Sequence, residues 1–229
     1  MRAAALILLA IPVSIVEAGS LRVAPTLLEI ADSRPVMLTI TNSGSQPSLI
    51  QLEAKRWTQG SGADEYGDAG DIIASPPIFR LEPGAEQIVR IGRRDSQSPA
   101  QEHAYRIFVQ EVATAANTSV TELNVLLRVG VPLFVKPMQA APAKIEFSLA
   151  CPASSTLELR LHNSGGRTTR IDQIVIDGNE GGSQKASALY LLAGATRLLT
   201  LDGLAPATTG VAVKGIVASG ELQSSLTCK

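Results

Sequence analysis

The two histidines and two cysteines of this 229-residue chain are its obvious candidates for nucleophilic or metal chemistry. His103 and His162 lie far apart in the sequence, and neither has the spacing to a cysteine that a zinc site requires. The chain contains no Gly-x-Ser-x-Gly motif, so a serine nucleophile of that type is excluded. We therefore predict no catalytic residue, no metal site and no cofactor, and a β-sandwich metalloenzyme is the weakest hypothesis for this chain.

Four acidic residues gather in, or directly after, the glycine-rich stretch of residues 60–70. They are Asp64, Glu65, Asp68 and Asp71. Carboxylates are ligands that calcium prefers, but the spacing does not match the EF-hand loop. Charge runs beside glycines are usually solvated, so we expect a polar loop here. The adjoining Gly60-Ser61-Gly62 is too short for a phosphate-binding loop.

The first eighteen residues are typical of a secretory signal. Arg2 precedes an apolar run over residues 3–16, and Val16-Glu17-Ala18 supplies small residues for cleavage after Ala18. An uncleaved anchor or a buried N-terminal helix is the alternative, but the run is short for a membrane span, which needs about 20 apolar residues. No later stretch is long and apolar enough to span a bilayer, so we expect an exported protein that is not membrane-embedded.

Cys151 and Cys228 are the only cysteines, and they begin and end the second half of the chain. Disulfides form in exported proteins, and an even count favours pairing. We therefore predict a disulfide that closes the second half, with two separate buried thiols as the alternative.

Composition points to a β-rich globular protein. Hydrophobic residues make up 45% and charged residues 18%, and the net charge of -1 gives no basic surplus for nucleic acid. Aromatic residues are only 3%, while glycine and proline occur throughout. Short runs rich in Val, Ile, Leu and Thr, separated by such turn residues, are typical of strands.

These runs form two series. The first comprises 21–30 (with a break at Pro25), 36–41, 48–57, 72–74, 78–81, 87–91, 105–112 and 123–135; the second comprises 143–149, 156–163, 169–176, 188–192, 196–201, 211–218 and 222–228. We predict an all-β fold with a sandwich from each series, a first domain at 19–137 and a second at 138–229. The prolines of 136–143 mark a hinge. Asn42-Ser43-Gly44 and Asn163-Ser164-Gly165 follow similar strands and hint that the domains are related.

The run Leu123–Val135 is apolar at every odd position, which gives one continuous hydrophobic face. A strand buries such a face in its own core or in a partner, and the pattern alone does not decide between them. Pro132 cannot donate to a sheet ladder, so one edge is expected to be free there. A free hydrophobic edge is an aggregation hazard unless pairing is its role.

Several segments, in order along residues 21–137, resemble the periplasmic chaperones of the chaperone–usher pathway, the PapD-like family. They are Leu38-Thr39-Ile40-Thr41-Asn42, Trp57, Ser75-Pro76-Pro77, Arg80-Leu81-Glu82-Pro83-Gly84, Gln87-Ile88-Val89-Arg90-Ile91, Glu102, Tyr105-Arg106-Ile107, Glu111 and Val131-Pro132-Leu133-Phe134-Val135-Lys136-Pro137. The second half resembles the family only by position and by its cysteine pair.

The resemblance implies two immunoglobulin-like domains set at an angle, with a subunit-binding cleft between them. It also implies that the seventh strand completes the fold of a pilus subunit by donor-strand complementation. The donor residues are then Leu123, Val125, Leu127 and Val129. Partners implied in this way are pilus or fimbrial subunits and an outer-membrane usher, in the periplasm.

The family's anchor for the subunit's terminal carboxylate is absent here. The aligned positions are Thr26 and Pro132, which carry no charge. An arginine fork suits a carboxylate, so Arg106 is the first candidate, Arg90 the second and Arg128 the third. These changes, together with Gly130-Val131-Pro132, resemble the archaic branch of the family.

The resemblance also suggests a charged contact between the domains that uses Glu102 and Lys136. A secreted adhesin or fibre subunit is the alternative function, and in it the segment 21–30 would serve as a donor.

Overall fold

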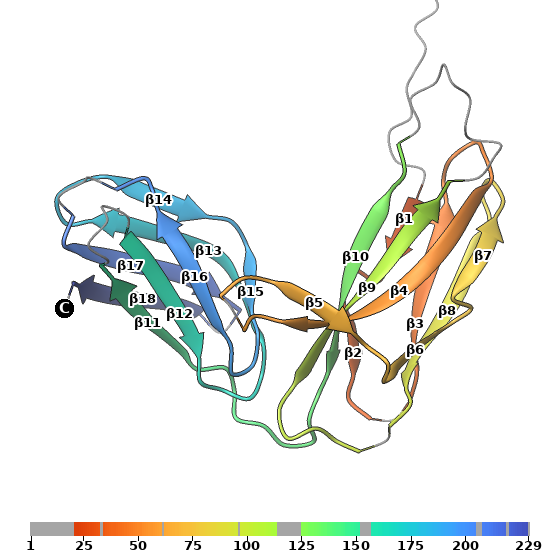
Figure 1. The fold of residues 1–229 in the computed structure, drawn as a ribbon, viewed down its shortest axis with the longest axis horizontal. Coiled ribbons are helices and arrows are strands. Elements are labelled where there is room, and N and C mark those ends of the chain that lie inside the picture. Colours follow the sequence, from red (N-terminus) through yellow and green to blue (C-terminus); the bar gives the residue numbers. More distant parts are fainter. Residues whose placement is uncertain are drawn as a thin grey trace, which may run out of the picture.

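The computed structural model describes residues 21–228 apart from 33, 61, 96, 114–124, 152–156, 205–207 and 219. Every regular element in this part is a β-strand, and the strands form four sheets (Figure 1), which confirms the all-β prediction. Among these residues, we find no helix with the length and hydropathy that crossing a membrane requires. The predicted signal, residues 1–18, lies outside the described residues.

The first sandwich is built from two sheets. One has the order β1 (Leu21–Ala24), β3 (Val36–Asn42), β8 (Glu86–Arg93), β6 (Ile72–Ser75); the other has the order β2 (Leu28–Ile30), β10 (Arg128–Val135), β9 (His103–Val112), β4 (Ser48–Thr58), β5 (Glu65–Asp68), with β7 (Ile78–Leu81) also beside β4. The break expected at Pro25 is therefore the point where the chain passes from one sheet to the other.

The second sandwich has the same plan with fewer strands. One sheet has the order β11 (Ile145–Ala150), β12 (Leu157–Asn163), β16 (Thr196–Leu201); the other has the order β14 (Ser183–Ala186), β13 (Thr169–Gly178), β17 (Gly210–Val217), β18 (Gly220–Thr227), with β15 (Leu189–Leu191) beside β13. Figure 1 shows the two sandwiches inclined to each other, with β5 between them.

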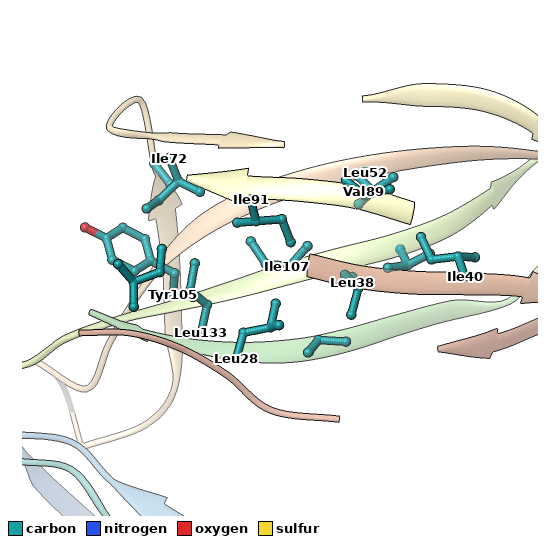
Figure 2. Close-up of a cluster of buried hydrophobic side chains, with 14 of the residues drawn as sticks. Leu28, Leu38, Ile40, Leu52, Ile72, Val89, Ile91, Tyr105, Ile107 and Leu133 are labelled. Carbon is teal, nitrogen blue, oxygen red and sulfur yellow. The ribbon is translucent and has the colours of Figure 1, made fainter. Parts of the chain in front are cut away.

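Alternation along the strands builds each core. On β9, Tyr105, Ile107 and Val109 are fully buried, and the side chains between them face outward. Figure 2 shows side chains from both sheets, including Leu38 and Leu133, meeting in the space between the sheets. A separate cluster around Leu159, Ile174 and Val213 fills the second sandwich. Burial of these aliphatic faces, at about 25 cal/mol per Å², supplies the main stabilisation of each domain.

Two features differ from the sequence prediction. Residues 125–127 are described but belong to no strand, and β10 begins only at Arg128; the apolar alternation continues beyond the end of this domain's own core. The stretch expected to be a solvated loop contains β5, in which Tyr66 pairs with Trp57 and Asp68 lies opposite Lys55. Asp64 accepts hydrogen bonds from Trp57, Gln59 and Arg197, and Asp68 lies 3.6 Å from the Lys55 ammonium, which the charge pattern alone does not indicate.

Candidate functional site

Strand β10 has an open edge over part of its length. It pairs with β9 from Arg128 to Val135, but with β2 only from Leu133 to Val135. Among the described strands, Arg128–Pro132 therefore has a partner on one side alone. Backbone groups on such an edge are available to an added strand.

The direction of the backbone groups on β10 follows from the hydrogen bond made by Leu127, the residue directly before the strand. The N–H of Glu111 donates to the carbonyl of Leu127, at 2.9 Å. Since the direction alternates along a strand, odd-numbered residues bond to β9 and even-numbered residues point to the open edge. Gly130 thus offers both an N–H and a carbonyl there, whereas Pro132 offers only a carbonyl.

The hydrophobic face of this segment divides into two parts. Val131, Leu133 and Val135 are buried in the first domain, and half-buried Val129 packs against the same core. Val125, by contrast, is 69% exposed, and Leu127 is half-buried. Leu123 lies outside the described residues. Val129 thus packs in the core of the first domain, whereas Val125 and Leu127 lie beyond the end of that core.

Glu111 holds the segment where it leaves the sheet. Its carboxylate accepts a hydrogen bond from the N–H of Leu127 at 3.0 Å and another from the hydroxyl of Ser48 at 3.1 Å. Its backbone N–H bonds Leu127 as well. These contacts keep Leu127 aligned with the end of β9 although it lies outside the regular strand.

Arg106 lies directly beside the open edge. Arg106 lies on β9, opposite Pro132 of β10. Its guanidinium carbon lies 4.1 Å from the centre of the Trp57 ring, and its Nη1 donates to the Gly130 carbonyl at 3.4 Å. No ion pair joins Arg106 to any carboxylate in the described part of the chain. A cation stacked on indole in this way is ordered but keeps its charge available.

Gly130 makes room for this arrangement. A Cβ at this position would lie 3.2 Å from Arg106 Cδ and 3.2 Å from Phe108 Cε1. Both side chains therefore lie close over the strand because residue 130 has no side chain.

The other two arginines proposed from the sequence are placed differently. Arg128 lies 3.9 Å from the Phe108 ring centre and 3.4 Å from the Glu53 carboxylate, so its charge is already paired. Arg90 is exposed on β8, in the opposite sheet, where it pairs with Met37 and Ser75. The structure brings Arg106 and Arg128 to the strand and leaves Arg90 away from it.

The two residues expected at the domain interface also differ. Glu102 is buried and does reach the second domain: its carboxylate accepts the Thr168 N–H at 2.9 Å, and its own N–H donates to the Gly166 carbonyl at 3.0 Å. Lys136 instead pairs with Glu29 of the first domain, at 2.6 Å. The interdomain contact of Glu102 is thus made with backbone groups.

An apolar cluster and a hollow lie where the domains meet. Trp57, Ala104 and Phe134 of the first domain pack with Leu192 and Tyr190 of the second. Beside them is a hollow of about 290 Å³, lined by residues 56–60, 101–104 and 192–196. The two domains are therefore joined by hydrophobic packing beside this hollow.

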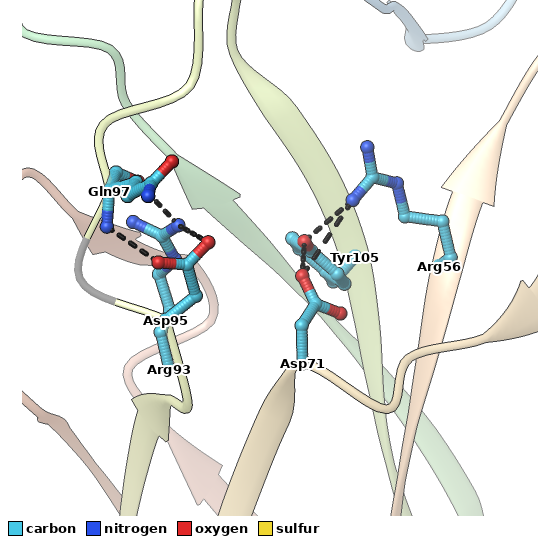
Figure 3. A network of polar contacts seen from close by, with 6 residues as sticks. All are labelled: Arg56, Asp71, Arg93, Asp95, Gln97 and Tyr105. Atoms are coloured by element: carbon cyan, nitrogen blue, oxygen red, sulfur yellow. Dashed lines mark hydrogen bonds and ion pairs between the residues drawn. The ribbon is translucent and has the colours of Figure 1, made fainter.

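A polar group is buried at the adjoining end of the first sandwich (Figure 3). The Tyr105 hydroxyl donates to Asp71 and accepts a hydrogen bond from Arg56 Nη1 at 2.6 Å. Burial, followed by the bond to Asp71, raises the pKa of Tyr105 to about 12. Burial, followed by the charge of Arg56, lowers the pKa of His103. Nearby, Arg93 lies beside Asp95 and donates to the Gln97 carbonyl.

In the second domain, a disulfide joins Cys151 and Cys228, with the Cα atoms 5.7 Å apart. It links the end of β11 to the end of β18 across a sequence separation of 77. The pairing predicted from the sequence is present.

Residues 20–141 match the model of the pili and flagellar-assembly chaperone family, PapD N-terminal domain. The chain belongs to this chaperone family. A search of curated proteins found no match.

Solved structures share the chaperone's whole fold at low sequence identity. The CsuC–CsuE chaperone–tip adhesion subunit pre-assembly complex, from archaic chaperone-usher Csu pili of Acinetobacter baumannii, matches with a TM-score of 0.70 and 19% identity, covering 92% of this chain and 100% of that chain. The YadV chaperone matches with 0.66 and 16%, covering 90% and 98%. The Salmonella enterica SafA pilin–SafB chaperone complex matches with 0.62 and 15%, covering 91% and 97%.

Sequence reasoning missed three residues that organise this chaperone's site. In the sequence, Glu111 stands out only as part of a family motif, and nothing local indicates that Gly130 makes room for Arg106 and Phe108. Asp64 was assigned to a solvated loop, but its carboxylate accepts hydrogen bonds from Trp57 and Gln59. Trp57 and Gln59 lie two residues apart, and a glycine-containing turn separates them from Asp64. This spacing predicts hydrogen bonds to Asp64 only when the hairpin of β4 and β5 is already known.

Proposed function

We propose that this chaperone captures pilus subunits by donor-strand complementation, with residues 123–127 as the inserting part of the strand. The observation that carries the proposal is the open edge of β10, which leads directly into exposed Val125. Chaperone–pilin complexes are an established case of strand addition, in which backbone bonds supply affinity and side-chain pockets supply selectivity.

The available energy supports transient capture. Each aliphatic side chain transferred from water into a subunit core contributes about 1.5–3 kcal/mol. Association costs reduce that gain, so two or three inserted residues need the added backbone bonds to hold a subunit. The backbone N–H and carbonyl groups of Arg128 and Gly130, which point to the open edge, are positioned to make those bonds.

Arg106 is the best candidate to bind the subunit's terminal carboxylate. Its charge is unpaired among the described residues, it lies beside the open edge, and Trp57 holds its guanidinium in place. Arg128 is already matched by Glu53, and Arg90 lies on the other sheet. A charge-assisted fork at Arg106 would replace the family anchor that Thr26 and Pro132 lack.

The predicted signal and the family support a proposal for the cellular setting of this activity. We propose export to the periplasm with removal of residues 1–18, followed by delivery of the captured subunit to an outer-membrane usher. The anchor and the Gly130-Val131-Pro132 segment favour the archaic branch.

Co-purification from the periplasm tests the function directly. The tagged chaperone is isolated and its partners are identified by mass spectrometry. Recovery of small secreted subunits in a one-to-one complex is the expected result. Recovery of self-polymers of this chain would contradict it, because self-polymers are the behaviour of a fibre subunit.

A further inference from the structure

The turn between β4 and β5 reaches across to the second domain. The Gly62 carbonyl accepts the N–H of Leu198 at 3.1 Å, and Leu198 lies on β16, the edge strand of its sheet. Gly62 has a φ of +88°, and a Cβ there would lie 2.7 Å from Leu198 Cγ. Only glycine fits this contact without displacement.

Asp64 is the polar centre of this contact. One carboxylate oxygen, Oδ1, accepts hydrogen bonds from Trp57 Nε1 at 3.0 Å, from Gln59 Nε2 at 2.9 Å and from Arg197 Nη1. Trp57 and Gln59 belong to the first domain, whereas Arg197 lies on β16 of the second. The Asp64 and Arg197 side chains are 30% and 23% exposed, so solvent screens their ion pair only in part.

Gln59 adds a second link from the same turn. It is 3% exposed, its Nε2 also donates to the Tyr190 carbonyl at 2.9 Å, and its Oε1 accepts the Leu192 N–H at 3.1 Å. The buried amide is thus bonded at both ends, as burial requires. Because its donor is shared with Asp64, the carboxylate and the amide orient each other.

Trp57 connects this centre to the site on β10. Its ring is 2% exposed and packs against Phe134 and Tyr190, with centroids 6.1 and 5.5 Å away. The Arg106 guanidinium lies on the ring, and Arg106 in turn donates to Gly130. A continuous set of contacts therefore runs from Arg197 through Asp64, Trp57 and Arg106 to the open edge.

We propose that Asp64 is a positioning residue that fixes the Trp57 ring under Arg106. Because Asp64 also binds Arg197, the position of the ring depends on the docking of the second domain. This role rests on the proposed function, in which Arg106 binds a subunit carboxylate. Apolar packing at the interface holds the domains together but does not fix the orientation of the Trp57 ring. The three donors on Asp64 Oδ1 define one orientation of the indole. Loss of the link therefore loosens Arg106 while the two cores remain folded.

The single tryptophan of the chain gives a direct readout. The indole N–H resonance of uniformly ¹⁵N-labelled protein is recorded for wild type, Arg197→Ala and Asp64→Asn, with Arg170→Ala as control. Arg170 forms an exposed pair with Asp172 in the second domain and is outside the site. A shifted or broadened indole signal in the first two variants, with the control at the wild-type position, is expected. An unmoved signal in both overturns the proposal, whatever subunit capture does.

A double-mutant cycle separates positioning from general stability. Arg197→Ala is expected to weaken subunit capture about three- to thirtyfold, which lies within the range of coupling between contacting residues. In an Arg106→Ala background it should cost nothing more, because Asp64 acts through Arg106. An equal loss in both backgrounds, or no loss in either, refutes the role. If Val125→Asp/Leu127→Asp captures subunit normally, the proposed donor-strand function is wrong. The indole signal tests the positioning role of Asp64 independently of that result.

Discussion

Asn42 and Asn163 make three corresponding hydrogen bonds in the two domains. Each is fully buried at the end of a strand, and each donates through Nδ2 to the carbonyl four residues later, at 2.8 Å. Each also donates to the carbonyl of a strand in the other sheet of its sandwich, and each accepts the N–H of the glycine two residues on, Gly44 or Gly165. The two sandwiches therefore use one corner motif twice, which supports a common origin.

Replacing Asn163 by Ala should destabilise the second domain by about 2–4 kcal/mol, because several buried backbone groups lose their partner. Asn42→Ala should do the same to the first domain. Hydrogen exchange followed by mass spectrometry resolves the two domains. Each variant should lose protection mainly in its own domain, and uniform loss across both would contradict independent corner motifs.

Much of this fold could be predicted from local pattern. The alternation of Tyr105, Ile107 and Val109, the break at Pro25 and the repeated Asn-Ser-Gly all correspond to observed structure. The pattern failed where it depends on a partner. Residues 125–127 alternate like β10 but extend past the core, and Asp64 is charged like a loop residue but is bonded by residues up to 133 positions away. Such long-range contacts leave little trace in local sequence.

Arg106→Ala should weaken subunit capture about ten- to a hundredfold, since a charge-assisted hydrogen bond contributes about 1.5–3 kcal/mol. Arg106→Lys should recover only part of this, because an ammonium lacks the planar fork. Affinity is measured by titration calorimetry with a purified subunit.

Two controls sharpen the Arg106 experiment. Arg90→Ala removes the same charge from the opposite sheet and should bind normally. A subunit extended by several residues at its C-terminus should bind the wild type and Arg106→Ala equally. If Arg90→Ala is the weaker variant, the assignment of the anchor is wrong.

Tyr105 should make stability depend on alkaline pH. Its folded-state pKa of about 12 exceeds the usual value near 10. As pH rises, the unfolded chain therefore releases this proton first, so the stabilisation is complete below about pH 10 and is lost between about 10 and 12. The difference in the free energy of unfolding between wild type and Tyr105→Phe, measured by urea unfolding at each pH, should show that decline. A difference that stays constant across this range would mean that the hydroxyl is not held protonated.

The most direct measurement of the central claim is capture by a chaperone whose inserting residues carry charge. Val125→Asp/Leu127→Asp is co-expressed with the subunit, and the complex recovered from the periplasm is quantified. Met37→Asp/Ile88→Asp is the matched control, with two exposed apolar side chains changed on the other sheet of the same domain. Donor-strand capture predicts that the first variant folds but loses the subunit by at least tenfold, because charge cannot enter the subunit core, while the control retains it. Undiminished capture by the Val125/Leu127 variant would contradict the account.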